Sequence, residues 1–141
     1  MSGAIVVGTV LRAAAAVTAK VPAERIRTGR LSDNAPLPTL LVRNVSQVER
    51  QPLKREGWVR QTWRVSVAVR AENYRDQGVI IALLNAVCPG VKGDVGDDAR
   101  NVSILAAGIG PDVSGPGDTY EQTHDFRVSF DAPVRPQQAG A

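Results

Sequence analysis

Few side chains in this sequence are suited to catalysis. Histidine and cysteine each occur once, as His124 and Cys88. His124 alternates with aromatic residues along an apolar stretch, where a histidine more often fills the core than acts as a general base. Cys88 follows an apolar helical pattern, so we interpret it as a small buried side chain at a helix end. No paired carboxylates stand in an apolar setting. The sequence therefore predicts a protein that is not an enzyme.

The acidic residues offer only a weak metal motif. Asp94, Asp97 and Asp98 lie among glycines and could hold a hard cation, but their spacing departs from an EF-hand loop and the closing Glu is absent. We favour a solvated acidic loop. Gly108-Ile109-Gly110 lacks the third glycine of a dinucleotide site. We expect no metal and no cofactor. The single cysteine also excludes an internal disulfide and suits a reducing compartment.

Basic residues form a stronger candidate surface. They cluster in a polar loop and in the strand after it, with Trp58 between the two. Because Lys and Arg bind phosphates irrespective of base sequence, one interpretation is a nucleic-acid patch. The aromatic residues fall mostly on predicted buried positions, so such binding would be sequence-independent. The candidate assembly or partner contacts are Arg50, Lys54, Arg55, Arg60, Arg64 and Arg70 on the basic side and Asp94, Asp97 and Asp98 on the acidic side.

Charge is unevenly distributed along the chain. The formal net charge is +3, yet residues 1–75 hold 13 of the 17 Lys and Arg against 5 acids, and residues 76–141 hold 4 against 9. This asymmetry suits copies of one chain that pack basic surface against acidic surface, and it equally suits a nucleic-acid patch or a solvated surface. For Arg60, Arg64 and Arg70 we rank pairing with the acids of a neighbouring subunit above contact with DNA.

The longest predicted strand carries these three arginines. Residues 59–70 alternate between apolar and polar side chains, and a period of two gives a strand one buried and one exposed face. Trp63 is the predicted centre of the buried face. The buried parity holds Val59, Trp63, Val65, Val67 and Val69, and the exposed parity holds Arg60, Thr62, Arg64, Ser66 and Arg70.

Two helices are predicted, one on each side of the long strand in sequence. Ser2 can cap the first, over about residues 4–19, and the second spans about residues 73–88. The first apolar stretch is too short to cross a bilayer and lacks a preceding basic residue, so we expect no membrane association. The apolar stripes are Val6, Val10, Ala13, Ala14 and Val17 in the first helix and Val79, Ile80, Leu83, Leu84 and Val87 in the second.

Four further strands complete the predicted order α-β-β-β-α-β-β. They cover residues 25–28, 39–45, 102–107 and 120–130, and the polar or Gly-, Pro- and Asp-rich segments 47–57, 91–100 and 108–119 are predicted loops. We expect 47–57 and 91–100 to be mobile and to contact partners.

The order indicates a single-domain α+β fold over residues 1–132, with a mainly antiparallel or mixed β-sheet, two helices packed on one face and a flexible C-terminal tail over 133–141.

Several local sequences occur in an order that resembles the tail terminator, or tail completion, family of long-tailed bacteriophages and related particles. The resemblance covers almost the whole chain. It rests on an Ala-rich first helix, the strand entry Ala35-Pro36-Leu37-Pro38, the strand Trp63-Arg64-Val65-Ser66-Val67, the apolar helix from Val79 to Val87 and the closing strand Asp125-Phe126-Arg127-Val128-Ser129-Phe130.

This resemblance implies a structural virion protein, made in the host cytoplasm, that acts at the head-proximal end of the phage tail. Its subunits would form a ring, expected to be a hexamer, that ends polymerisation of the tail tube and offers a surface for joining the head. The implied partners are further copies of the chain, the tail tube protein and head-tail connector proteins, with non-specific contact to passing DNA and no membrane. No catalytic, cofactor or metal residue is implied.

Two alternatives remain at this point. The first is another component of the same junction, such as a head-tail connector or a minor tail protein of similar size. The second is a small sequence-independent nucleic-acid-binding module, for which we would expect the isolated monomer to bind DNA in a salt-sensitive way.

Overall fold

A computed structural model of the chain describes residues 1–50 and 57–134. Its helices are α1 (Gly3–Ala13), α2 (Ala15–Thr18) and α3 (Tyr74–Val87), with two 3-10 turns, η1 (Ala23–Arg25) and η2 (Pro116–Asp118). Its strands are β1 (Ile26–Thr28), β2 (Thr39–Glu49), β3 (Trp58–Ala71), β4 (Lys92–Val95), β5 (Ala99–Ile109), β6 (Val113–Gly115) and β7 (Thr119–Pro133).

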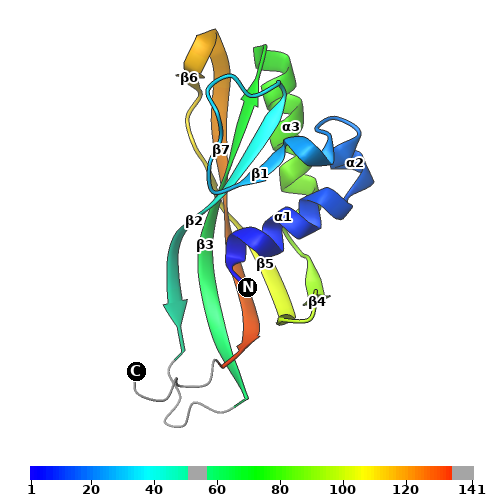
Figure 1. Cartoon of the computed structure of the whole chain (residues 1–141), viewed down its shortest axis with the longest axis vertical. Helices are drawn as coiled ribbons and strands as arrows, with labels where there is room; N and C mark the ends of the chain where they lie inside the picture. The colour runs from blue at the N-terminus through cyan, green and yellow to red at the C-terminus, as the bar shows by residue number, and fades with distance from the viewer. Residues whose placement is uncertain (51–56, 135–141) are drawn as a thin grey trace.

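The strands form one twisted, mixed sheet in the order β1-β2-β3-β7-β5-β4, with β6 added against β7 (Figure 1). Only the pairing of β1 with β2 is parallel, and the other pairings are antiparallel. Helices α1 and α3 pack on one face, where their apolar residues join those of β2, β3, β5 and β7 in a single core. The predicted α+β class, with a mixed sheet and helices on one face, is confirmed.

Strand β3 is the centre of this arrangement and has the predicted buried face. Val65, Val67 and Val69 are fully buried against the helices. Burial of each such side chain contributes about 1.5 to 3 kcal/mol before the entropy of the chain is counted. The opposite parity is only partly exposed, because Ser66 and Arg70 are 8% and 7% exposed. The prediction that Arg70 faces solvent is therefore wrong.

The first helix is interrupted, contrary to the prediction of one helix over residues 4–19. Ser2 caps α1 as predicted, since its Oγ accepts a hydrogen bond from the N–H of Ile5 at 3.3 Å. At Ala14 the backbone is extended, with φ −84° and ψ 110°, and α2 starts in a new direction. The break brings Val17 into the core and leaves Ala13 exposed.

Helix α3 follows the prediction closely at its ends. Asn73 caps it by accepting a hydrogen bond from the N–H of Asp76 at 2.8 Å, and Cys88 follows its last residue. Ile80, Ile81 and Leu84 supply its buried stripe, whereas Val79 is 38% exposed and was wrongly placed on that stripe. No helix in the described part of the chain is long and apolar enough to cross a membrane.

Parts of three predicted loops are strands in the structure. In each case the reason is that the backbone pairs with a neighbouring strand. Strand β2 continues to Glu49 because, past an irregularity between Asn44 and Ser46, its backbone stays paired with β3. In the same way β4 pairs with β5, and β6 pairs with β7. Their sequences, KGDV and VSG, show no alternation of apolar residues, so only pairing with a neighbour makes them strands.

The core is centred on β7 rather than on Trp63. Phe126 and Phe130 are the largest fully buried side chains, whereas Trp63 is half-buried and packs against the edge of the core. The N-terminus of α1 lies directly over this tryptophan. A Cβ atom on Gly3 would be 2.5 Å from Trp63 Cβ, so only glycine allows the helix to come this close.

The end of β7 lies where the C-terminal tail was expected to begin. Pro133 is the last residue of β7, and the N–H of Val134 donates to the carbonyl oxygen of Gly57 at 2.8 Å. The rest of the predicted tail, residues 135–141, lies outside the described residues.

Candidate functional site

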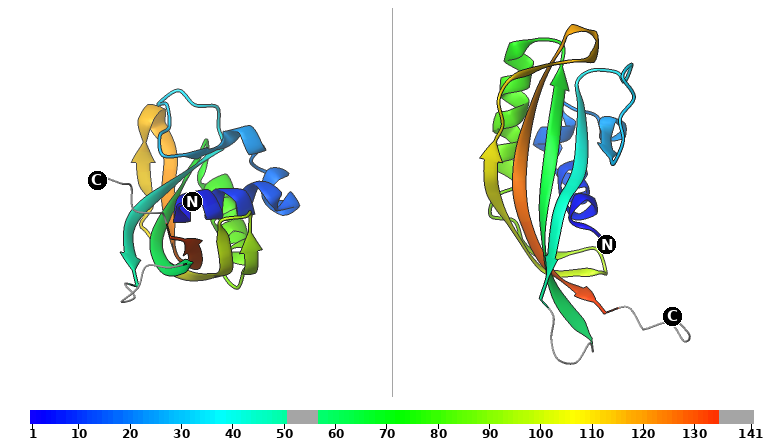
Figure 2. Two further views of the ribbon diagram at one scale, coloured as in Figure 1. Left: turned by 60° about the horizontal axis from the view of Figure 1, so that its bottom comes forward. Right: turned by 90° about the vertical axis from the view of Figure 1, so that its left-hand side faces the viewer.

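One face of the sheet is not covered by the helices, and it carries the arginines that the sequence singled out. Figure 2 (right) looks onto this face, with α1 and α3 behind the strands. We call it the outer face. Cross-strand register assigns to it Arg43, Ser46 and Val48 of β2, Arg60, Thr62, Arg64, Ser66, Ala68 and Arg70 of β3, Glu121, Thr123, Asp125, Arg127, Ser129 and Asp131 of β7, and Leu105 of β5.

Arg60 is held at the lower end of the outer face by a carboxylate of β7. Its Nη1 lies 3.3 Å from Oδ1 of Asp131, directly opposite in the sheet, and donates to the carbonyl oxygen of Asn101 at 2.8 Å. The side-chain amide of Asn101 completes a triangle by donating to Oδ2 of Asp131 at 2.9 Å. Arg60 therefore links β3, β7 and β5.

Arg64 makes a diagonal pair, because the residue directly opposite it is Arg127. Its Nε and Nη2 donate to the same oxygen, Oδ2 of Asp125, at 3.0 and 2.9 Å. The side chain of Arg64 is 48% exposed and that of Asp125 is 21% exposed. Exposed pairs of this kind contribute on the order of 0 to 1 kcal/mol to stability, so the contact positions Arg64 more than it stabilises the fold.

Arg70 is buried beneath the segment that leads into β2. Its Nη1 donates to the carbonyl oxygen of Ser32 at 3.3 Å, and its Nη2 lies 3.5 Å from Oε1 of Glu121. The Nε atom is buried without a hydrogen-bond partner in the described structure. The fold therefore encloses Arg70 and gives it contacts within its own chain.

These three pairs account for part of the charge asymmetry along the sequence. The basic residues come from β3 and the acids from β7, which lie far apart in the chain but are neighbours in the sheet. Opposite charges of the two halves are therefore brought side by side within one molecule. The pairing of Arg60, Arg64 and Arg70 with acids of another subunit remains a prediction, and each already has an acid of its own chain.

Arg127, like Arg43, is an exposed cation of the outer face that these three pairs do not include. It is exposed and has no hydrogen-bond or ion-pair partner among residues 1–50 and 57–134. A cavity of about 210 Å³ lies beside it, lined by Ser46, Val48, Thr62, Trp63, Arg64, Ala107 and Arg127. Val48, which lines the cavity, is 71% exposed, and Leu105, directly opposite Arg127 on β5, is 55% exposed. The site combines two arginines, two hydroxyl groups and an apolar rim.

Of the other predicted basic residues, Arg50 lies within the described part of the chain. Arg50 is exposed, and its N–H donates to the carbonyl oxygen of Arg60 at 2.9 Å. Lys54 and Arg55 lie outside the described residues. Trp58 is 37% exposed and is covered by the guanidinium of Arg100, 3.9 Å from the ring centre, so part of its face is already occupied.

The predicted acids lie on β4 and on the turn that follows it. Oδ1 of Asp94 accepts a hydrogen bond from the N–H of Asn101 at 3.1 Å, which ties β4 to β5. Asp97 and Asp98 are exposed in the turn, after Gly96 with its positive φ of 63°. The described residues contain no group of three or more potential metal ligands.

The two reactive side chains identified in the sequence are both enclosed by the fold. His124 is 1% exposed, stacks on Phe126 at 4.2 Å and has Nε2 3.0 Å from Oδ1 of Asn85. Burial lowers the pKa of His124, against a smaller opposing effect of Asp125. Burial raises the pKa of Cys88 to about 12. Neither residue lines the cavity beside Arg127 or the cleft near the N-terminus.

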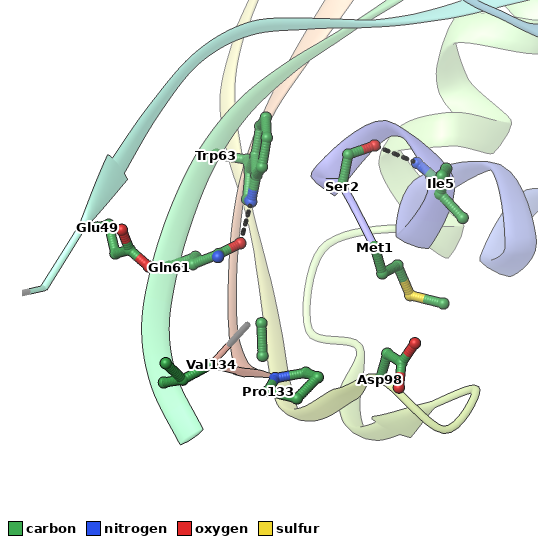
Figure 3. A pocket seen from close by; sticks show the side chains of 10 residues that line it. Met1, Ser2, Ile5, Glu49, Gln61, Trp63, Asp98, Pro133 and Val134 are labelled. Atoms are coloured by element: carbon green, nitrogen blue, oxygen red, sulfur yellow. Dashed lines mark hydrogen bonds between the residues drawn. The ribbon is translucent and has the colours of Figure 1, made fainter. Parts of the chain in front are cut away.

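A larger cleft lies between the N-terminus and the ends of the long strands (Figure 3). Its volume is about 670 Å³, and Trp63 forms one wall, with its Nε1 donating to Oε1 of Gln61 at 3.0 Å. Asp98 lies at its rim, close to Met1 in this view. The lining residues are Met1, Ser2, Ile5, Glu49, Gln61, Trp63, Asp98, Ala132, Pro133 and Val134.

Arg127 was absent from the predicted contact residues, although a signal for it existed. It has the same parity as Asp125 and Asp131 in the alternating closing strand, so the sequence already placed it on an exposed face. Its position opposite Arg64 follows only from the order and register of the strands, which the sequence pattern does not specify.

The comparisons with known proteins give a structural match without a sequence match. No protein family matches the sequence, and no curated protein does. The fold matches a solved chain described as "Virion of native gene transfer agent (GTA) particle", with a TM-score of 0.61. The two chains are 14% identical, and the match covers 93% of this chain and 96% of that chain. At this identity the likeness establishes a shared fold.

Proposed function

We propose that this chain is a structural subunit of a phage-like virion, which forms a ring at the head-proximal end of the tail tube. There it ends tube polymerisation and provides the surface to which the head is joined. The observation that carries the proposal is the match of the fold, over 93% of this chain, to a chain from a gene transfer agent virion. The order of local sequences that resembles tail terminators supports the position at the tube end.

The surface of the subunit is compatible with this role. A ring needs two different patches on each subunit, because the contact between neighbours is heterologous. The outer face offers exposed arginines, and the turn between β4 and β5 offers exposed acids. His124 and Cys88 are enclosed and serve the core. We therefore assign the chain a structural rather than an enzymatic role.

The second candidate is a head-tail connector or minor tail protein at the same junction. The same structural match supports it, because the matched chain is described as part of a virion, without a position within it. A third candidate is sequence-independent contact with nucleic acid. Arg127 supports it, because its side chain has no partner among the described residues. For this candidate we expect the monomer to bind DNA in a salt-sensitive way.

Inactivation of the gene in a strain that makes the particle separates these candidates. Loss of a terminator should give tail tubes of uncontrolled length without heads, and the gene supplied in trans should restore tails of one length. Tails of normal length beside unjoined filled heads would favour a connector. Particles of normal structure and number would contradict both virion assignments.

A further inference from the structure

We propose that Arg64 and Arg127 form a docking site for the acidic turn between β4 and β5, with Asp97 and Asp98, of a second copy of this chain. The inference rests on the proposed ring and identifies one contact that would build it. We call the Arg64–Arg127 pair with the cavity beside it the arginine site, and residues 96–98 the acidic turn.

The arginine site has more positive charge than its own chain compensates. Arg64 and Arg127 are directly opposite on neighbouring strands, and like charges in that position repel one another. Among the described residues, Asp125 is the one carboxylate that contacts them, and both of its hydrogen bonds to Arg64 use Oδ2. Arg127 has no partner in the described parts of the chain. A second anionic group is therefore needed to neutralise the pair.

The lining of the site favours a protein carboxylate over a nucleic-acid phosphate. Next to the arginines the cavity presents side chains of Ser46 and Thr62, and the exposed apolar residues Val48 and Leu105 border it. Arginine beside apolar surface is typical of protein interfaces. A phosphate backbone has no apolar surface to cover Val48 and Leu105. Trp63 also lines the cavity, but its side chain packs against the core on the helix-covered face and is not available for stacking on a base.

The acidic turn has the complementary properties. Asp97 and Asp98 are both exposed, and neither has a hydrogen-bond or ion-pair partner within residues 1–50 and 57–134. Asp94, by contrast, is occupied by the N–H of Asn101. The turn is short and closed by pairing of Val95 with Ala99, so its carboxylates are presented from a fixed backbone. They lose little conformational freedom when they bind.

The two surfaces lie on different sides of the subunit, as a ring requires. In Figure 1 the outer face is turned to the left, and β4 with its turn lies at the lower right, beyond α1. A contact between the outer face of one copy and the acidic turn of the next is heterologous, and repetition of such a contact closes into a ring or continues as a helix. Within the described part of one copy, neither aspartate contacts either arginine, so the charges would meet between copies.

Charge reversal with rescue tests this contact. Arg127→Glu, and separately the double variant Asp97→Lys with Asp98→Lys, should each weaken self-association by about tenfold or more, measured by sedimentation or light scattering over a concentration series. The variant that combines all three changes should recover most of the affinity of the parent chain. Arg75→Glu and Glu72→Lys are matched controls, because they change the charge of exposed residues away from both surfaces and should associate like the parent.

Several results would overturn the inference, and they are distinguishable from failure of the proposed function. Normal association of both reversed variants, or additive loss without rescue in the combined variant, would show that these groups do not meet. If Arg127→Glu instead abolishes only salt-sensitive retention of duplex DNA, the site binds phosphate and the inference is wrong. In these cases the parent chain would still be found at the tail end. A parent chain that never associates and is absent from tail ends would contradict the ring itself.

Discussion

Arg64 and Arg127 lie directly opposite each other on β3 and β7, on the face of the sheet that the helices do not cover. Within residues 1–50 and 57–134, Asp125 is the one carboxylate that pairs with either arginine, and its partner is Arg64. Pairs of like charge at such positions reduce the stability of a sheet. Because Arg127 makes no side-chain polar contact within the described residues, we assign it to the proposed docking site.

The first prediction is that the isolated subunit does not need Arg127. We expect Arg127→Thr to leave the free energy of unfolding unchanged or to raise it by about 0.2 to 1 kcal/mol, because it removes a like-charge neighbour. Arg60→Thr should lower it, since Arg60 contacts both Asp131 and Asn101. Denaturant titration of the monomer measures both. A clear loss of stability in Arg127→Thr would show that this side chain supports the fold.

The second prediction concerns two glycines that lie in helices, Gly3 in a crowded position and Gly78 in an open one. Gly3→Ala should destabilise the protein by about 1 to 3 kcal/mol, because its Cβ would overlap Trp63 and Val65. Gly78→Ala should stabilise it by about 0.4 to 1 kcal/mol, because no atom outside its own turn of helix lies within 4 Å of the added methyl group and alanine favours the helix. Thermal or denaturant unfolding tests the pair. Equal effects of the two changes would mean that α1 does not approach β3 as described.

The third prediction is a pH dependence that originates at His124. Burial lowers the pKa of this imidazole in the folded state, so the unfolded chain binds a proton more readily. The contribution of His124 to the free energy of unfolding should therefore be constant above about pH 7.5 and should decrease as the pH falls through about 6.5, by at most about 1.4 kcal/mol per pH unit. His124→Gln should remove this slope between about pH 5.5 and 7.5. An unchanged slope in that variant would assign the effect to other groups.

The fourth prediction concerns the thiol of Cys88, which is fully buried and whose pKa burial raises to about 12. The thiolate is the reactive form, so iodoacetamide at pH 8 should not modify the native protein over the time in which it modifies the denatured chain. Mass spectrometry of the two samples measures the difference. Rapid stoichiometric labelling of the native protein would show that α3 opens easily at its C-terminal end.

The sequence was sufficient for those features that depend on local patterns. The alternation in residues 59–70 predicted β3 and its buried valines, and Ser2 predicted the start of α1. The exposure of Arg70 could not be predicted in the same way, because the segment around Ser32 covers it from a distant part of the chain. Strands β4 and β6 are short and rich in glycine or polar residues, so their structure depends on the strands beside them.

The candidate site was predictable only in part for a similar reason. Composition and parity placed arginines on one face of β3, and they suggested that acids from the second half of the sequence would neutralise them. They did not show that β7 of the same chain supplies those acids. The position of Arg127 opposite Arg64 depends on the order of strands in the sheet, and this order is set by packing over the whole domain.

The central claim is that copies of this chain form a ring at the head-proximal end of a tail tube, and an electron cryo-microscopy map of that junction in purified particles tests it most directly. We expect several symmetry-related copies of the described fold in one closed layer between the tube and the head, with the arginine site of each copy facing the acidic turn of the next. A single copy per particle, or copies located away from the tube end, would contradict the claim.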